Sequence, residues 1–348
     1  RCWAAENNAE CIHNTDGDSF KEGDYYFGGE DDGAMTTGWL QMDITYDEAT
    51  NDYEIAPVFN EDEDQSRWFY FKSNGKKLYA DNGERTKDKT INGKKYAFDE
   101  YGAMVAEWSL DEDDLGTNPN AFTSNVASSA EVITGKAFDS KYTESWKYFN
   151  SVEDGARVSK GWFKVVPAEY LNEDKYNDDE DFWYYADGSG NLYAGEFKTI
   201  KGKKYAFRND GRMLTGLKFI LEDDDNDNLT VYADDDGTYN FDNEDDFLDN
   251  AVDFYEPGGY KCYYFGGGDD GAMRTNKTTV EIDGENHNFY FEKSGSKKGA
   301  GVTGEKDDKL YQSGMLLKAD SDDKYVVVDK TTKYTTNAAG EKVLDYVT

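Results

Sequence analysis

The chain has 348 residues and a net charge of −35, with 37% hydrophobic and 16% aromatic residues. This charge excludes nucleic acid and an anionic lipid membrane as expected partners, because both require a positive protein surface. No stretch approaches the roughly 18 apolar residues of a membrane-spanning helix. The first residue is Arg1 and no signal peptide is visible, so we expect a mature or truncated form.

The composition favours β-strands joined by tight turns. Tyr occurs 27 times, Phe 20 times and Gly 34 times, whereas Pro occurs 4 times. Aromatic side chains are enriched in strands, and Gly supplies the backbone conformations of tight turns. We therefore expect many small aromatic contacts in place of one large aliphatic core.

A single phrase recurs from the beginning of the chain to its end: an aromatic strand, a polar turn containing Gly, and a short apolar strand. Clear copies are YYFGGEDDGAM (25–35), WFYFKSNGKKL (68–78), KYAFDEYGAM (95–104), WKYFNSVEDGARV (146–158), WYYADGSGNL (183–192), KYAFRNDGRM (204–213), CYYFGGGDDGAM (262–273) and FYFEKSGSKK (289–298). The period-2 aromatics and the Asp/Asn/Gly turns predict a β-hairpin for each copy.

A hairpin is only marginally stable alone, so neighbouring hairpins must stack. We predict an all-β fold, a β-solenoid of stacked hairpin repeats with acidic loop insertions. The predicted organisation is an N-terminal segment (1–20), a first triplet of repeats (21–110), a spacer (111–145), a second triplet (146–220), an acidic insertion with a degenerate repeat (221–261) and a third triplet that degenerates at its C-terminal end (262–348).

Side chains alternate across a strand, so each aromatic tetrad has two faces. Positions two and four are aromatic in nearly every copy, as in Phe69 and Phe71, which predicts the packed interior. Positions one and three vary between copies: Trp68 and Tyr70 in one, Lys95 and Ala97 in another. A face that changes between copies is a candidate binding surface.

Six of the seven Trp residues fall into three sets, each made of a Trp in a GW or EW pair and the next Trp-x-Tyr strand. The sets are Trp39/Trp68/Tyr70, Trp108/Trp146/Tyr148 and Trp162/Trp183/Tyr185. Packing of the hairpins alone is the alternative explanation for these residues.

The phrases GW, WFYF, DGAM and NGKKYAF resemble the choline-binding, or cell-wall-binding, repeats of Gram-positive surface proteins. They also resemble the glucan-binding repeats of streptococcal glucosyltransferases and the repeats of clostridial toxins. The resemblance extends over nearly all of the chain after residue 20. It implies that each Trp set forms an aromatic cage between consecutive repeats, with Met35 as a further wall. The intervals within the sets are longer here than in those families, so the intervening residues must loop out.

Catalytic and metal chemistry have little support in the sequence. His287 lies in GENHNF, which predicts a solvated hairpin turn. Asp223, Asp225 and Asp227 have the alternate spacing of a calcium loop, but Asn228 replaces the required Gly, and we favour a solvated acidic loop. No other cofactor or metal is expected.

The sequence therefore predicts a non-catalytic module of a secreted protein attached to the bacterial cell surface. Its expected partner is a cell-wall polymer, bound at the aromatic cages through choline or the sugar rings of a polysaccharide. The alternative is an adhesin-like scaffold that binds a host glycan or protein through its acidic insertions. In either case we predict that the chain is not an enzyme.

Overall fold

The structure is a computed structural model that describes residues 2–13, 19–28, 32–44, 65–81, 85–110, 143–168, 171–223, 228–231, 241–255, 259–328, 331–336 and 342–347. The chain divides into two compact units, Arg1–Tyr193 and Ala194–Thr348. Their border falls inside the predicted second triplet; the finer subdivision by repeats stays a prediction. None of the helices in the described ranges is long and apolar enough to cross a membrane.

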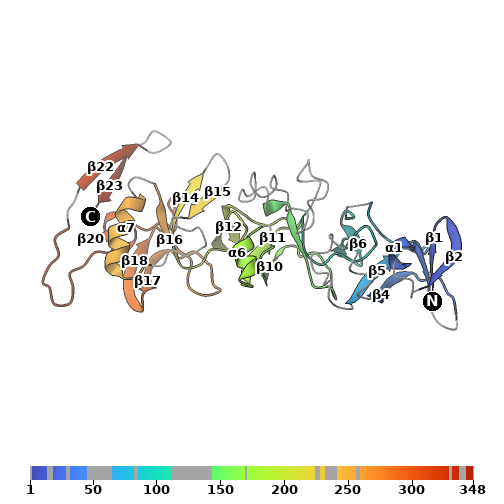
Figure 1. Cartoon of the computed structure of the whole chain (residues 1–348). Helices are drawn as coiled ribbons and strands as arrows, with labels where there is room; N and C mark the ends of the chain where they lie inside the picture. The colour runs from blue at the N-terminus through green and yellow to red at the C-terminus, as the bar shows by residue number, and fades with distance from the viewer. Residues whose placement is uncertain are drawn as a thin grey trace. The chain divides into compact units, whose positions relative to one another are not determined.

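The first unit consists of antiparallel strands (Figure 1). Its elements are β1 (Cys2–Ala5), β2 (Asn8–His13), α1 (Ser19–Glu22), β3 (Tyr25–Phe27), β4 (Gly38–Ile44), β5 (Gln65–Phe71), β6 (Lys89–Ile91), β7 (Lys94–Tyr96), β8 (Glu107–Leu110), β9 (Trp146–Phe149), β10 (Gly161–Val165), α6 (Glu173–Asn177) and β11 (Phe182–Ala186). β1 lies between β2 and β3, and the later strands form the pairs β4–β5, β6–β7, β8–β9 and β10–β11.

The second unit is also mainly β-structure, with one longer helix. Its elements are β12 (Glu196–Ile200), β13 (Lys203–Phe207), β14 (Leu217–Asp223), β15 (Asn228–Val231), α7 (Glu244–Tyr255), β16 (Lys261–Tyr264), β17 (Asn276–Ile282), β18 (Glu285–Phe291), β19 (Gly304–Lys306), β20 (Lys309–Gln312), β21 (Met315–Leu316), β22 (Thr331–Thr336) and β23 (Lys342–Val347). The predicted all-β class is confirmed in that strands dominate both units. β15 and α7 lie in the predicted acidic insertion.

Most aromatic strands pair with the strand directly before them, whereas β3 pairs with β1 and β16 pairs with β14. Trp39 lies opposite Tyr70 in β4–β5, and Trp108 lies opposite Tyr148 in β8–β9. The Gly turn after the aromatic strand closes with a single bridge, as between Phe98 and Met104. The acidic insertion after Ile44 and the predicted spacer are thus connections within strand pairs. Residues 45–64 and 111–142 of these connections lie outside the described residues.

The Asp and Asn residues of the turns hold their loops through side-chain hydrogen bonds. The residue before the turn Gly accepts from a backbone N–H two positions on: Asn74 from Lys76 at 3.0 Å, and Asp210 from Arg212 at 3.2 Å. Such Asx turns explain why the repeated phrase keeps Asp or Asn beside Gly.

Successive hairpins are joined by one recurring backbone hydrogen bond. In five hairpins of the described ranges, the residue at the exit of the turn donates its N–H to the carbonyl of the first residue in the preceding aromatic tetrad. The pairs are Lys77 to Asp24, Met104 to Trp68, Arg157 to Lys95, Met273 to Lys204 and Gly301 to Cys262, at 2.7–2.8 Å. We call the residue at this position the exit residue; Met35 and Met213 hold the same position in their own hairpins, since they bridge to Phe27 and Phe207 as Met104 bridges to Phe98. A hydrogen bond that recurs at the same place fixes the step from one hairpin to the next in these five cases.

The exit side chain packs beneath the turn Gly of the following hairpin. Met35 lies under Gly75, Met104 under Gly155, and Met213 under Gly271. A Cβ at any of these Gly positions would overlap the Met side chain, and their φ angles of 64° to 82° are ones that other residues rarely adopt. The turn Gly is therefore required both by its own backbone and by the neighbouring repeat.

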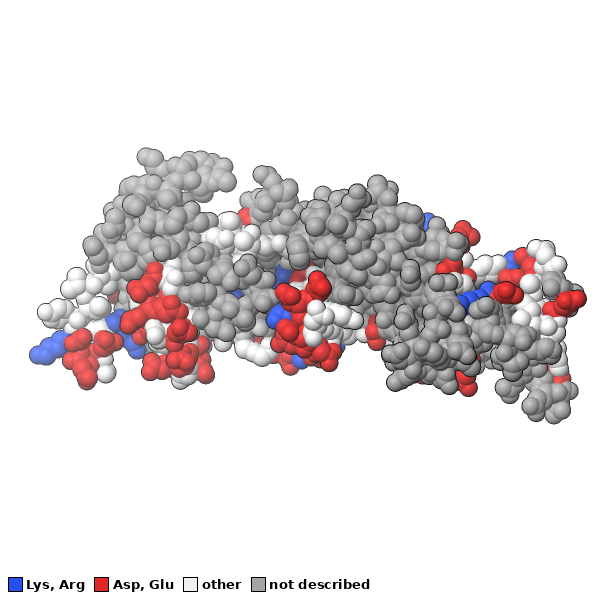
Figure 2. Space-filling model, in the orientation of Figure 1, with Lys and Arg blue, Asp and Glu red and all other residues white. Residues whose placement is uncertain are grey.

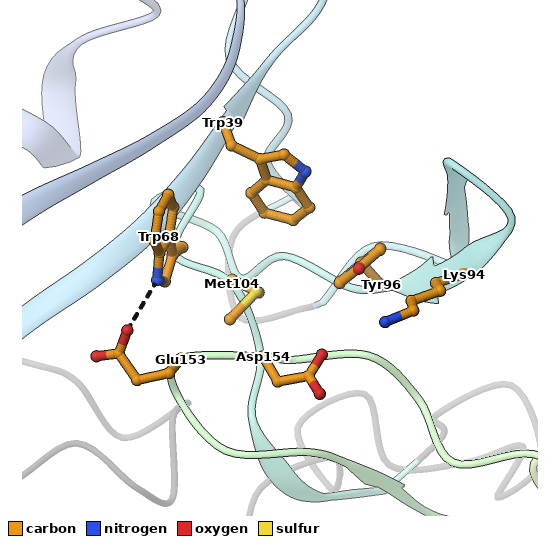
Figure 3. A pocket seen from close by; sticks show the side chains of 7 residues that line it. All are labelled: Trp39, Trp68, Lys94, Tyr96, Met104, Glu153 and Asp154. Atoms are coloured by element: carbon orange, nitrogen blue, oxygen red, sulfur yellow. Dashed lines mark hydrogen bonds between the residues drawn. The ribbon is translucent and has the colours of Figure 1, made fainter.

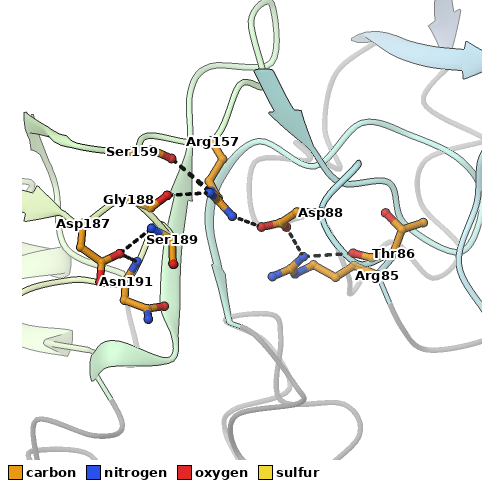
Figure 4. Close-up of polar contacts among 9 residues, drawn as sticks. All are labelled: Arg85, Thr86, Asp88, Arg157, Ser159, Asp187, Gly188, Ser189 and Asn191. Atoms are coloured by element: carbon orange, nitrogen blue, oxygen red, sulfur yellow. Dashed lines mark hydrogen bonds and ion pairs between the residues drawn. The ribbon is translucent and has the colours of Figure 1, made fainter. Parts of the chain in front are cut away.

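Arg157 is an exit residue that makes polar contacts in place of Met packing (Figure 4). Its guanidinium pairs with Asp88, which also receives a 3.1 Å hydrogen bond from Arg85. Arg157 also donates to the Gly188 carbonyl at 3.5 Å and to Ser159. One side chain thus links residues before β6 to the turn after β11.

The predicted interior face is largely confirmed. Phe69, Phe71, Phe98, Phe149, Phe207 and Phe265 are fully buried. In the first hairpin the opposite face is buried, because Tyr26 packs against Trp3 with ring centroids 5.0 Å apart.

The solvated turn predicted for His287 is wrong. His287 lies within β18, opposite Val280 of β17, and is 5% exposed. The turn of this hairpin is at Asp283 and Gly284, and Glu244 of α7 lies 3.7 Å from the imidazole Nδ1. Helix α7, which lies beside His287, does not belong to the repeated phrase, so the sequence pattern did not indicate it.

We predict that Gly155→Ala destabilises the first unit by about 1–3 kcal/mol more than Gly93→Ala. Both residues have positive φ, but a Cβ at Gly155 would overlap Met104, whereas a Cβ at Gly93 meets open space. Urea unfolding of the two variants measures this difference. Equal losses would show that the Met contact adds nothing to the backbone requirement.

Candidate functional site

All three predicted aromatic sets are assembled, with nearly the same geometry. The two indoles of a set are 6.3–6.4 Å apart and inclined by 85–88°. The first Trp and the Tyr are 5.1–5.2 Å apart, because they lie opposite each other in a strand pair. The long insertions do not separate the members of a set, since each insertion connects the two strands that carry them.

The first set borders a cavity of about 350 Å³. The cavity is lined by Trp39, Trp68, Lys94, Tyr96, Met104, Glu153 and Asp154 (Figure 3). Two of the three predicted residues, Trp39 and Trp68, therefore line it. Tyr70 packs behind Trp39 and toward Phe98, at 6.5 Å. Met35, predicted as a wall, is not among the lining residues.

The next hairpin supplies the other apolar walls. Tyr96 lies 4.9 Å from Trp39 at an angle of 68°. Met104, the exit residue, forms the floor below the two indoles (Figure 3). The sequence analysis placed Tyr96 in the packed interior, and its ring is in fact nearly buried while one part of it reaches the cavity.

Two carboxylates come from the hairpin after that, in the turn between β9 and β10. Glu153 accepts a 3.4 Å hydrogen bond from the Trp68 indole and 3.3 and 3.4 Å hydrogen bonds from the Gln41 amide. Asp154 lies beside Glu153 and accepts from the Ala156 N–H at 3.4 Å. Neither residue was predicted, because no sequence signal connects a turn near residue 153 with a strand near residue 68.

The indoles of the second set are buried. Trp146 is fully buried and Trp108 is 5% exposed, and the Trp108 indole donates to the Val166 carbonyl at 2.7 Å. Phe163 stacks on Tyr148 at 4.9 Å and on Tyr184 at 5.5 Å. Trp108 and Tyr148 border a different, larger cavity of about 780 Å³ beside α6.

Two substitutions between the repeats explain why one set is open and the other closed. Strand pairing places Lys89 opposite Tyr96 and Phe163 opposite Tyr184. The same register aligns Lys94 with Phe182, which packs against the buried second set. Lys side chains turn their charged ends to water, whereas Phe side chains fill the space beside the indoles.

In the third set, Trp162, Trp183 and Tyr185 are half-buried. Tyr185 stacks on Tyr193 of the same hairpin, with centroids 5.0 Å apart and planes inclined by 13°. The geometry of the set matches that of the first.

Lys77 shows how this fold surrounds an ammonium group with aromatic rings. It is an exit residue, and its Nζ lies 5.0 Å from the Trp3 centroid and 5.9 Å from that of Phe69. The ammonium donates to the Phe20 carbonyl at 2.7 Å. Burial lowers the pKa of Lys77 from its usual 10.5 to about 7, although the charges of Asp99 and Asp24 oppose this shift.

Across the described ranges, no three His, Cys, Asp or Glu residues lie close enough to hold a metal ion. Residues 224–227 of the predicted calcium loop lie outside those ranges.

No protein-family model and no curated protein matches the chain. Solved structures from Streptococcus pneumoniae are similar to it. The modular autolysin LytC is 18% identical, with a TM-score of 0.35 over 84% of this chain and 41% of LytC, so the chain spans less than half of that protein. Choline-binding protein F, solved with a peptidoglycan analogue, is 21% identical, with a TM-score of 0.32 over 92% of this chain and 89% of that protein. CbpJ is 18% identical, with a TM-score of 0.31 over 92% and 90%.

These structural neighbours agree with the resemblance to choline-binding repeats.

Lys77 generates a prediction about pH. The folded state holds fewer protons on Lys77 than the unfolded state between the two pKa values, so stability rises with pH in this range. We expect the free energy of unfolding to rise from pH 7.5 to 9 by up to about 1.4 kcal/mol per pH unit more in the wild type than in Lys77→Met.

Lys76→Met is the matched control for this experiment. Lys76 is partly exposed, and its hydrogen bond to Glu6 raises its pKa above the usual value, so its loss leaves the slope between pH 7.5 and 9 unchanged. Denaturant titrations at several pH values measure the slopes. Identical slopes in all three proteins would mean that Lys77 remains charged in the folded state.

Proposed function

We propose that the chain is a non-catalytic module that binds an organic ammonium group, such as choline on a cell-wall polymer, in the cavity of the first aromatic set. The observation that carries the proposal is the cavity itself: two indoles at a right angle, a Tyr, a Met floor and two carboxylates. Ring faces attract cations electrostatically, by about 0.5–2 kcal/mol each.

The right angle between the indoles favours a compact cation over a flat sugar ring. A sugar stacks on one broad aromatic face, whereas Trp39 and Trp68 form a corner inclined by 88°. Glu153 and Asp154 add negative charge at its mouth. The net charge of −35 would draw cations toward the protein, and acidic side chains predominate on the described part of the face in Figure 2.

In this proposal the hairpins form a β-solenoid that presents binding positions at successive repeats. The first set is open to its cavity. In the second set, Phe163 and Phe182 of the next hairpin pack against the indoles. The third set has the geometry of a site. The protein would be secreted and held at the bacterial cell surface by the polymer that it binds. The recurring exit hydrogen bonds within each unit support the solenoid.

We expect choline to bind the full chain in isothermal titration calorimetry, and Trp68→Ala to weaken this binding about tenfold, because one ring of the corner is lost. Tyr79→Ala is the control: Tyr79 is an exposed aromatic residue that does not line the cavity. Thermal unfolding of both variants checks that the fold is intact. Unchanged choline binding by Trp68→Ala would reject this cavity as the site and favour the acidic insertions as the interaction surface.

A further inference from the structure

The cavity of the first set has a negative end and a positive end. Glu153 lies at the Trp68 indole, and Lys94 lies at the side of Tyr96 (Figure 3). Lys94, Glu153 and Asp154 all line the cavity, and no ion pair joins Lys94 to either carboxylate in the described part of the chain. A bound cation is attracted to the Trp68 end and repelled from the Tyr96 end.

Glu153 keeps capacity to accept further hydrogen bonds at this end. Its contacts with Trp68 and Gln41 are 3.3–3.4 Å long, beyond the usual range for N–H donors. A carboxylate offers about four lone-pair sites, and charge-assisted bonds from ammonium donors are the strongest that it accepts. Asp154 has a single long contact, from Ala156.

A quaternary ammonium cannot use these acceptors, because it has no N–H. Its methyl groups would displace water from Glu153 and Asp154 without replacing the lost hydrogen bonds. A site built around hydrogen-bond acceptors discriminates against a ligand that lacks the donor. A protonated primary amine would fill the same aromatic corner and donate to one or both carboxylates.

We propose that this cavity selects an ammonium that carries N–H, a protonated primary amine such as that of an amino alcohol, over a quaternary ammonium. This inference rests on the proposed function, since it concerns the ligand class of the same cavity. Glu153 is the residue that determines the specificity, and the aromatic walls supply affinity common to both ligands. The site needs three consecutive hairpins: one for the indoles, one for Tyr96 and Met104, and one for Glu153.

The test compares ethanolamine with choline by isothermal titration calorimetry on the full chain at pH 7, where both are cations. We expect ethanolamine to bind about tenfold more tightly than choline, the factor given by one additional hydrogen bond. Glu153→Gln should reduce this preference to about twofold or less, mostly through weaker ethanolamine binding. Glutamine keeps the size, and its one oxygen can take the place of the Glu153 oxygen that accepts from both Trp68 and Gln41, but the charge and the second acceptor oxygen are lost.

Glu100→Gln is the matched control. Glu100 stands two residues before Gly102, as Glu153 stands two residues before Gly155, but it does not line the cavity. This variant should keep the full preference for ethanolamine.

Choline binding equal to or tighter than that of ethanolamine in the wild type overturns the inference and leaves the proposed function intact. The same holds if the preference for ethanolamine survives Glu153→Gln. If neither ammonium binds, both the inference and the proposed function are rejected.

Discussion

The structure depends on the contact between the exit residue of one hairpin and its two neighbours. The exit N–H donates to a carbonyl of the preceding aromatic strand, and the exit side chain lies under the Gly of the following turn. Backbone and side chain of one residue thus fix three successive repeats. Because the hydrogen bond uses only the main chain, the side chain at this position can vary while the step between hairpins is kept.

The side chain of the exit residue therefore makes different contacts in different hairpins. Met35, Met104 and Met213 give apolar packing, and Met104 also forms the cavity floor. Arg157 carries a polar network, and Lys77 places a charge among buried rings. Lys77 is the least favourable of these for stability, because burial disfavours its charged form. Asp99, also buried, has its pKa raised to about 6 by burial, and Arg67 opposes that shift.

The sequence predicts the features that recur in every repeat, but it does not predict contacts between residues of different repeats. Period-2 aromatics predicted the strands and the interior face, because both depend on local spacing, and the order of the repeated phrases along the chain predicted the membership of the three Trp sets. The pairing of β8 with β9 across residues 111–142 has no local signal. Glu153 is 85 residues from Trp68, so its role at the first set depends on how hairpins stack. His287 was misplaced because the helix that buries it lies outside the repeat pattern.

The three Trp sets also show that a motif and a site are different things. Trp108, Trp146 and Tyr148 have the same mutual geometry as Trp39, Trp68 and Tyr70, yet both indoles of the second set are buried, whereas Trp39 and Trp68 are half-buried and line their cavity. The difference lies in the following hairpin, where Phe163 and Phe182 take the places of Lys89 and Lys94. The aromatic residues within a repeat can therefore form a site. Whether the next repeat carries charged or aromatic side chains beside them determines whether they face solvent or are packed.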